Sequence, residues 1–298
     1  MPATPDLAAF LAPPAPTLLP LPPAAHPEPG VQLLRGVPYA YRAGLRPLEL
    51  DLWSPDEPRG GPLPVIVYVH GGGWRAGTRT ELGPAFRHWR PGPFARLARA
   101  GFAVAAVDYR LSGEAVYPAQ LEDVTAALSW LTARAGELGL DTGRTVAWGE
   151  SAGAHLASLL ALTSPVSGCV AWYGPMDLTS LPAQSRPGTY DAADATTREA
   201  LLIGAPVAEA PELARAASPV AHVTAGAPPF LVLHGTDDAL IPLAQGEQFA
   251  AALREAGVQV DFRPVPGADH GWAGLPDADV ERCFATSVEF AHARTATP

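Results

Sequence analysis

Short, uninterrupted apolar runs alternate with helix-like segments along most of this sequence. Each run is long enough for a strand buried on both faces, and the segments between them carry apolar residues at helical spacing. Strands of that kind are typical of a parallel sheet covered by helices on both sides. The alternation therefore predicts an α/β domain with a mostly parallel central sheet flanked by helices. The runs are residues 65–69, 102–107, 145–148, 168–172 and 230–233, and the helical segments are 93–100, 117–134, 152–162, 243–256 and 277–292.

Three further strands are expected at 31–41, 47–53 and 259–263, and one long region interrupts the alternation. Residues 176–226 are too many for a single connection and contain short helical pieces. An insertion of that size is expected over the carboxyl edge of the sheet, where open α/β sheets bind ligands. We interpret residues 176–226 as a small cap-like insertion.

The first 30 residues are rich in alanine and proline. They lack the basic start and the uninterrupted apolar stretch of a signal peptide, and their repeated prolines break any helix that could span a membrane. We therefore expect residues 1–30 to be a flexible or surface-packed arm and residues 31–298 to form one domain. No membrane association is expected, and a cytoplasmic location is predicted.

Composition and charge exclude several partners and chemistries. The chain has 48% hydrophobic residues, enough for a sizeable core, and its net charge of −10 argues against nucleic acid or an anionic membrane as a partner. All 20 basic residues are arginine, so no lysine is present for a Schiff base or a phosphate-binding loop. Cys169 and Cys283 are interpreted as small buried hydrophobic residues. No spacing of His, Asp or Glu indicates a metal site, and no cofactor is expected.

Ser151 stands in the pattern Gly149-x-Ser151-x-Gly153, between a predicted strand and a predicted helix. In a tight strand-to-helix turn, a serine hydroxyl is raised above the edge of the sheet, and the residues two before and two after it must be small. The first amide of the following helix points into the same space and adds the positive end of the helix dipole. The pattern predicts a nucleophilic serine.

Three other segments complete a candidate site. The stretch "HGGGW" (70–74) follows the strand 65–69, and its main-chain amides could donate hydrogen bonds to a developing oxyanion. The stretch "VLHGTDDALIP" places Asp237 and Asp238 after one predicted strand, and "VPGADHGW" places His270 after the next. A serine hydroxyl needs an imidazole to accept its proton and a carboxylate to orient that imidazole. Serine, acid and histidine are therefore expected together at one edge of the sheet.

These motifs resemble those of the α/β-hydrolase esterases. The resemblance is strongest to the bacterial branch related to hormone-sensitive lipase and to the BD-FAE-type carbohydrate-ester and feruloyl esterases. It covers roughly residues 31–295 and is carried by "HGGGW", "VDYRLS", "YPAQLEDV", "GESAGAHLA", "SPV…PPFLVLHGTDDALIP" and "ADHGW". The resemblance implies an α/β-hydrolase fold, although the chain lacks the helical N-terminal cap of the lipase-like members.

The resemblance also implies roles for individual residues. It assigns a catalytic triad to Ser151, Asp238 and His270, with Asp237 as the alternative acid. It places the oxyanion donors at the amides of Gly72, Gly73 and Ala152, where the amide of Trp74 could replace one glycine.

Other residues near these motifs have both structural and functional interpretations. We interpret His155, His70 and His234 as packing or hydrogen-bonding groups of the scaffold, and Glu150 as an anchor for neighbouring loops. We expect four residues to hold the oxyanion loop and the sheet edge in place: Asp108, Tyr109, Arg110 and Asp123. Three aromatic residues are candidates for the substrate pocket, with core packing as the alternative for each: Trp74, Tyr173 and Trp272.

The resemblance implies a serine hydrolase that cleaves carboxylic esters of small molecules through an acyl-enzyme, with short-chain acyl or aryl esters expected. One alternative is the same machinery acting on an amide, as in an arylformamidase or a small-peptide hydrolase. A further alternative is a non-catalytic ligand receptor built on the same fold. The sequence leaves open whether the protein is a monomer or a homodimer.

Overall fold

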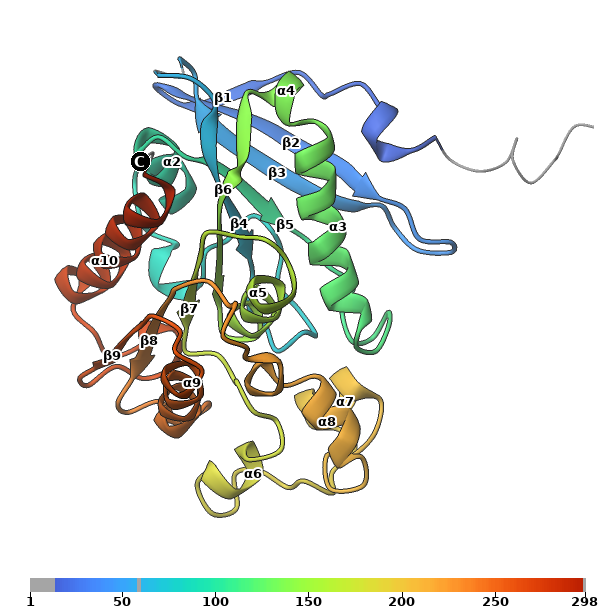
Figure 1. Cartoon of the computed structure of the whole chain (residues 1–298), viewed down its shortest axis with the longest axis vertical. Coiled ribbons are helices and arrows are strands. Elements are labelled where there is room, and N and C mark those ends of the chain that lie inside the picture. Colours follow the sequence, from blue (N-terminus) through green and yellow to red (C-terminus); the bar gives the residue numbers. More distant parts are fainter. Residues whose placement is uncertain (1–13, 58–59, 297–298) are drawn as a thin grey trace, which may run out of the picture.

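The computed structural model describes residues 14–57 and 60–296. Over these residues, nine strands form one sheet in the order β1-β2-β3-β5-β4-β6-β7-β8-β9 (Figure 1). Neighbouring strands from β5 to β9 in this order are parallel, whereas the β1, β2 and β3 pairings are antiparallel. The prediction of a mostly parallel sheet is confirmed. The strands are β1 (Ala25–Glu28), β2 (Val31–Ala40), β3 (Leu48–Pro55), β4 (Leu63–Val69), β5 (Ala103–Val107), β6 (Leu140–Glu150), β7 (Gly168–Trp172), β8 (Phe230–Gly235) and β9 (Val260–Val265).

The sheet begins before residue 31, where the domain was expected to start. β1 pairs antiparallel with β2, with Glu28 opposite Val31, and forms the edge of the sheet. The sequence gives little sign of this strand because Pro27 lies within it, and proline in a sheet is confined to edge strands, strand starts and bulges. Earlier in the expected arm, before β1, the carbonyl of Leu19 accepts a hydrogen bond from Arg134 (2.7 Å). The arm around Leu19 therefore packs on the domain surface. Residues 1–13 of the arm lie outside the described residues.

Helices cover both faces of the sheet (Figure 1). On one face lie α3 (Ala119–Ala133), α5 (Ala152–Thr163) and α9 (Leu243–Glu255), and on the other lie α2 (Pro93–Arg99) and α10 (Asp277–Thr295). The four short helices are α4 (Ala135–Leu138), α6 (Leu181–Gln184), α7 (Arg198–Ile203) and α8 (Pro211–Ala216). Within the described ranges, no helix has the length and apolar character needed to cross a bilayer.

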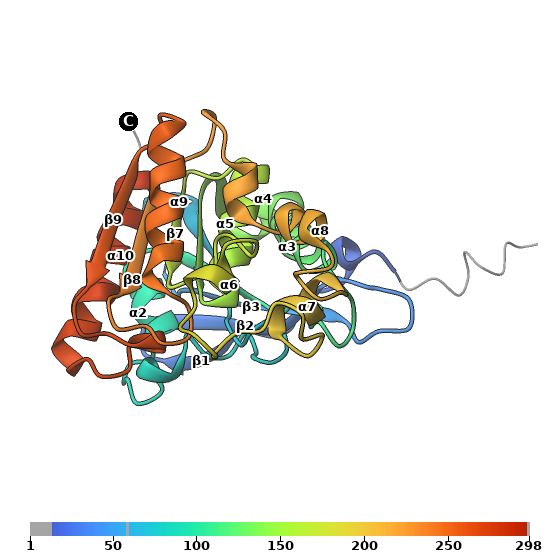
Figure 2. The ribbon, with the colours of Figure 1, turned by 90° about the horizontal axis from the view of Figure 1, so that it is seen from below.

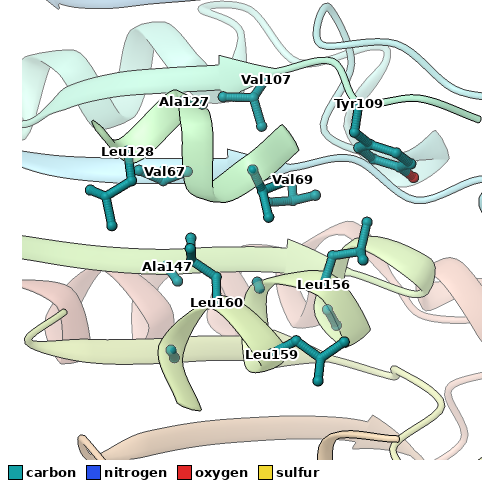
Figure 3. Close-up of a cluster of buried hydrophobic side chains, with 14 of the residues drawn as sticks. Val67, Val69, Val107, Tyr109, Ala127, Leu128, Ala147, Leu156, Leu159 and Leu160 are labelled. Atoms are coloured by element: carbon teal, nitrogen blue, oxygen red, sulfur yellow. The ribbon is translucent and has the colours of Figure 1, made fainter. Parts of the chain in front are cut away.

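Two hydrophobic layers hold the helices to the sheet. Side chains of β4 alternate between them: Val67 and Val69 face the layer under α3 and α5, and Ile66 and Tyr68 face the layer under α2 and α10. Figure 3 shows part of the first layer, where Leu156, Leu159 and Leu160 of α5 pack toward the sheet. Each fully buried valine, leucine or isoleucine side chain contributes about 1.5–3 kcal/mol to the free energy of unfolding. These layers therefore hold in place the strand ends that carry the site. Cys169 and Cys283 are free and buried, as predicted.

The helices α6, α7 and α8 all belong to the segment 176–226. They lie beyond the end of the sheet in Figure 1 and on the near side in Figure 2, which is viewed from below. Arg198, the first residue of α7, packs its side chain against Gly73, just after β4. The insertion therefore contacts the loops at the carboxyl edge of the sheet.

Candidate active site

Ser151 sits in a sharp turn between β6 and α5. Its backbone has φ 54° and ψ −124°, a combination that costs a non-glycine residue about 1–3 kcal/mol and is concentrated at functional sites. The turn is fixed from two sides, because Ser151 N–H donates to the carbonyl of Trp172 (2.9 Å) and His155 N–H donates to the carbonyl of Ser151 (3.2 Å). The hydroxyl is thereby held at the carboxyl edge of the sheet, as the sequence pattern predicts.

The two glycines around Ser151 are required by backbone that approaches them closely. A Cβ atom on Gly153 would lie 2.6 Å from the carbonyl oxygen of His70 and closer still to that of Val69. A Cβ atom on Gly149 would lie 2.7 Å from the backbone nitrogen of Ala154 and closer still to the carbonyl of Gly153. Real Cβ atoms almost never come this close, so α5 can pack against β4 and β6 only if both positions are glycine.

Ser151, His270 and Asp238 form one chain of hydrogen bonds. Ser151 Oγ lies 2.9 Å from Nε2 of His270, and Nδ1 of the same ring lies 2.8 Å from Oδ2 of Asp238. The residues follow β6, β9 and β8, three parallel strands that end at the same edge of the sheet. The three predicted triad residues are therefore brought together in the order and geometry that proton transfer from serine requires.

Asp238 is held as a carboxylate by its surroundings. Burial alone would raise its pKa, but the nearby ring of His234 (Nε2 3.5 Å from Oδ2), the hydrogen bond with His270 and the N–H of Ile241 outweigh burial and hold the pKa well below its usual range. Its Oδ1 accepts from the N–H groups of Leu240 (2.9 Å) and Ile241 (2.8 Å), which leaves Oδ2 for the imidazole of His270.

The neighbouring aspartates have other partners. Asp237, the alternative acid, is exposed, and its side chain contacts Thr236. Asp269 Oδ1 accepts from the N–H groups of His270 (2.7 Å) and Ala239 (2.8 Å), and so joins the loop that carries the histidine to the loop that carries the acid. Sequence analysis did not single out Asp269. Its place directly before the histidine and its short side chain, which suits the capping of a turn, are the signals that could have found it.

The glycine loop after β4 faces Ser151 across a cavity of about 600 Å³. Gly72, Gly73, Ser151 and His270 all line this cavity. In the described part of the chain, the N–H groups of Gly72, Gly73 and Ala152 donate to no protein acceptor. The same is true of the N–H of Trp74, so the glycine loop and the start of α5 together carry four backbone donors without a protein acceptor.

Buried polar groups brace this loop from below. Glu150 Oε1 accepts from the N–H of Gly71 (2.8 Å), and burial raises the pKa of this carboxyl. Tyr109 O–H donates to the carbonyl of His70 (3.0 Å), and Asp108 accepts from the N–H of Arg79 (2.9 Å) and pairs with its guanidinium. Glu150, Asp108 and Tyr109 thus take the anchoring roles expected of them.

Asp123 anchors the neighbouring edge of the sheet. It is fully buried and accepts from both the backbone N–H (3.0 Å) and the guanidinium (2.7 Å) of Arg110. The pair takes the scaffold role predicted for it.

The three histidines assigned to the scaffold are buried and bonded to backbone groups. His155 Nε2 lies 2.6 Å from the carbonyl of Ala217, and burial lowers the pKa of its ring to about 4. His234 Nε2 lies 2.8 Å from the carbonyl of Ile241, and His70 Nδ1 lies 2.7 Å from the carbonyl of Gly71.

The aromatic residues expected in the pocket lie behind it instead. Trp74, Tyr173 and Trp272 are each 1% exposed and are not among the residues that line the cavity. The Tyr173 ring packs edge-on against His270 (4.9 Å between centroids) and Trp272 (4.6 Å), and Trp74 packs edge-on against His155 (5.0 Å). All three have positive φ and are packed in the core, where they support the catalytic loops from behind.

Several cavity-lining residues were not predicted. Arg198 comes from α7, Leu240 from the loop after β8, and Glu81 and Arg87 from the long connection before α2. They lie in irregular segments, where sequence periodicity carries no signal. In residues 14–57 and 60–296, no group of three His, Cys, Asp or Glu side chains could hold a metal ion.

Comparisons with known proteins agree with this geometry. The family model described as BD-FAE matches residues 50–253, more than half of the chain. Esterase LipC of Mycobacterium tuberculosis is 33% identical over 248 residues, which cover 77% of this chain and 58% of LipC, so the chain spans little more than half of that relative.

Solved structures of two esterases also resemble this one. A truncated carbohydrate esterase from gut microbiota has a TM-score of 0.75 and 26% identity, over 89% of this chain and 96% of that one. A bacterial heroin esterase has a TM-score of 0.73 and 28% identity, over 90% and 86% of the two chains. This chain therefore belongs to the BD-FAE family and has the α/β-hydrolase fold.

Proposed function

We propose that this protein is a serine hydrolase that cleaves carboxylic esters of small molecules through an acyl-enzyme. One observation carries the proposal: Ser151 Oγ, the His270 ring and the Asp238 carboxylate are joined by hydrogen bonds of 2.9 and 2.8 Å. The serine also lies in a cavity beside free backbone donors. A receptor built on this fold does not need a serine, a histidine and an aspartate joined by hydrogen bonds. The presence of this chain of hydrogen bonds, called the relay below, therefore favours catalysis.

The proposed reaction uses each residue of the relay in turn. His270 Nε2 takes the proton of Ser151 as the hydroxyl attacks the ester carbonyl, and Asp238 stabilises the imidazolium that forms. His270 then protonates the leaving alcohol, and in the second half of the reaction it activates a water molecule that releases the acid. The free N–H groups of Gly72, Gly73 and Ala152, with that of Trp74 as an alternative, are assigned to the oxyanion, where losing one donor costs about 3 kcal/mol.

The walls of the cavity favour short or compact substrates. Its apolar lining residues are few, Leu240 and Pro84 among them, and most of the others are glycine or carry polar groups. A long acyl chain would find few large apolar side chains there to pack against, so we propose short-chain acyl or aryl esters. We also propose that the insertion 176–226 acts as the cap, because Arg198 of this segment forms part of the wall.

The names of the relatives support the choice of bond. LipC, the carbohydrate esterase and the heroin esterase are all named as esterases. Since this chain spans only part of LipC, we take from it the class of reaction and not a substrate.

The test is hydrolysis of 4-nitrophenyl esters from acetate to palmitate by the wild type, Ser151→Ala and Ser129→Ala. Ser129 is an exposed serine of α3 whose hydroxyl bonds only its own helix, so its variant is the matched control. We expect activity to peak at short chains and Ser151→Ala to lower kcat by about four orders of magnitude or more. Full activity in Ser151→Ala would refute the proposal, and faster cleavage of formanilides than of matched aryl esters would favour an amide hydrolase.

A further inference from the structure

One arginine in the wall of the cavity has no close partner. Arg198 lines the cavity together with Ser151 and His270, and its side chain is 31% exposed. Over the described residues its guanidinium makes no hydrogen bond, and its single ion-pair contact is a long one, 3.9 Å from Nε to Oε1 of Glu199. A guanidinium carries five N–H donors, and those of Arg198 are therefore available to a bound molecule.

The position of Arg198 is fixed by its stem. A Cβ atom on Gly73 would lie 2.8 Å from Cδ of Arg198 and 3.2 Å from Cγ, so the aliphatic part of the side chain lies on the glycine loop. Backbone of α7 supports it, because the Thr197 side chain caps the N–H of Ala200 (3.2 Å). The guanidinium is therefore held next to one of the proposed oxyanion donors.

The other charges around the cavity leave this cation uncompensated. Arg87 is paired with Glu81 (2.8 Å), and Glu150 accepts a hydrogen bond from the N–H of Gly71 in the glycine loop. Glu199 is only 1% exposed and has no hydrogen-bond partner for either oxygen within the described ranges. Burial raises the pKa of this carboxyl, which favours its neutral form and weakens its ability to balance Arg198.

The cavity also has room for more than a simple acyl group. Its volume of about 600 Å³ lies within the range of pockets that enclose a whole small-molecule ligand. An acetyl or propionyl group at Ser151 would leave most of this space, including the part beside Arg198, to the rest of the substrate.

We infer that Arg198 binds a carboxylate carried by the ester substrate, so that the preferred substrates are esters with a free acid group on the acyl or the alcohol part. This inference rests on the proposed ester hydrolysis. A planar guanidinium matches a carboxylate with two parallel hydrogen bonds. A phosphate dianion fits less well, because Glu81 and Glu150 line the same cavity and Arg198 is the one arginine there whose guanidinium makes no hydrogen bond among the described residues.

The test compares charged and neutral esters of the same size. Monoethyl glutarate and ethyl pentanoate differ by a carboxylate on the acyl side, and 4-acetoxybenzoate and its methyl ester differ by a carboxylate on the alcohol side. We would measure kcat/KM for both pairs at pH 7.5 by proton release. The variants are Arg198→Gln, Arg198→Lys and, as a control, Arg215→Gln, an exposed arginine of α8 in the same insertion that does not line the cavity.

For at least one pair, Arg198→Gln should lower the ratio of kcat/KM for the charged ester to that for the neutral ester by about 10- to 100-fold. Arg198→Lys should fall between the wild type and Arg198→Gln, because lysine keeps the charge but loses the bidentate geometry. Arg215→Gln should leave the ratio unchanged.

A binding measurement separates this inference from the proposed reaction. Calorimetric titration of the Ser151→Ala protein with monoethyl glutarate and with 4-acetoxybenzoate needs no turnover. Adding Arg198→Gln should weaken binding of at least one by a similar factor. If Arg198→Gln changes neither ratio and neither affinity, the inference is overturned, while Ser151-dependent hydrolysis of the neutral esters would still uphold the proposed function.

Discussion

Replacing Gly153 by alanine should disturb the active-site edge of the sheet more than its single added methyl group suggests. The new Cβ atom would meet the carbonyl of His70 at 2.6 Å, and an ordinary contact needs about 3.4 Å, so the backbone would have to separate by at least 0.8 Å. Overpacking of this kind costs about 1–3 kcal/mol. For a chain of this length, that corresponds to a fall in Tm of roughly 2–5 °C.

The same shift should reduce activity. His70 begins the loop that continues to Gly72 and Gly73, and a displacement of about 1 Å in a positioning group can cost a factor of about 100 in rate. We would measure Tm by scanning calorimetry and kcat/KM on 4-nitrophenyl acetate.

The matched control is Gly136→Ala. Gly136 lies in α4, and a Cβ atom there would meet nothing within 4 Å. Reduced entropy of the unfolded chain should stabilise this variant by about 0.4–1 kcal/mol without a change in activity. If Gly153→Ala behaved like Gly136→Ala in both measurements, the close packing of α5 against the end of β4 would be wrong, and with it our explanation of the serine turn.

The remaining predictions concern three sets of buried groups: Glu150, Asp238 and the two cysteines. Burial raises the pKa of Glu150 and so penalises its charged form in the folded protein. The stability of the wild type relative to Glu150→Gln should therefore fall as the pH rises above about 4. Glu150→Ala should cost about 1–3 kcal/mol in urea unfolding, because Gly71 N–H loses its acceptor. The pKa of Asp238 is lowered, so the stabilising effect of its carboxylate is present above about pH 4 and is lost as the pH falls further. The difference in unfolding free energy between the wild type and Asp238→Asn should therefore shrink as the pH falls below about 4. At pH 7 the same variant should lose about four orders of magnitude in kcat. Burial also raises the pKa values of Cys169 and Cys283, the latter to about 11, so a thiol reagent at pH 8 should label both only after denaturation, and rapid labelling of either in the native protein would contradict their burial.

The sequence predicts the sheet and the relay because both depend on strong local signals. An apolar run such as Val65–Val69 can be buried only inside a covered sheet, and the ends of parallel strands meet at one edge, so Ser151, Asp238 and His270 had to come together once their strands were recognised. The glycines beside Ser151 were also informative, because close backbone approach leaves no other choice of residue.

The cavity wall could not be predicted in the same way. Arg198 belongs to a six-residue helix in an irregular segment, and nothing in its local sequence indicates that it reaches Gly73. Tyr173 and Trp272 stand beside catalytic loops in the sequence, but they pack against each other and are buried in the core. The position of these residues in the sequence therefore predicted correctly that they lie near the catalytic loops. It did not predict that their side chains point into the core and away from the cavity.

The most direct test of the central claim is covalent labelling of the serine. Diethyl 4-nitrophenyl phosphate reacts with a serine only where a base takes its proton and donors bind the phosphoryl oxygen. We predict release of one equivalent of 4-nitrophenol per chain, a diethylphosphoryl group on the peptide that contains Ser151, and labelling slowed by orders of magnitude in His270→Ala. Absence of an adduct, or an adduct on another residue that persists in Ser151→Ala, would contradict the account.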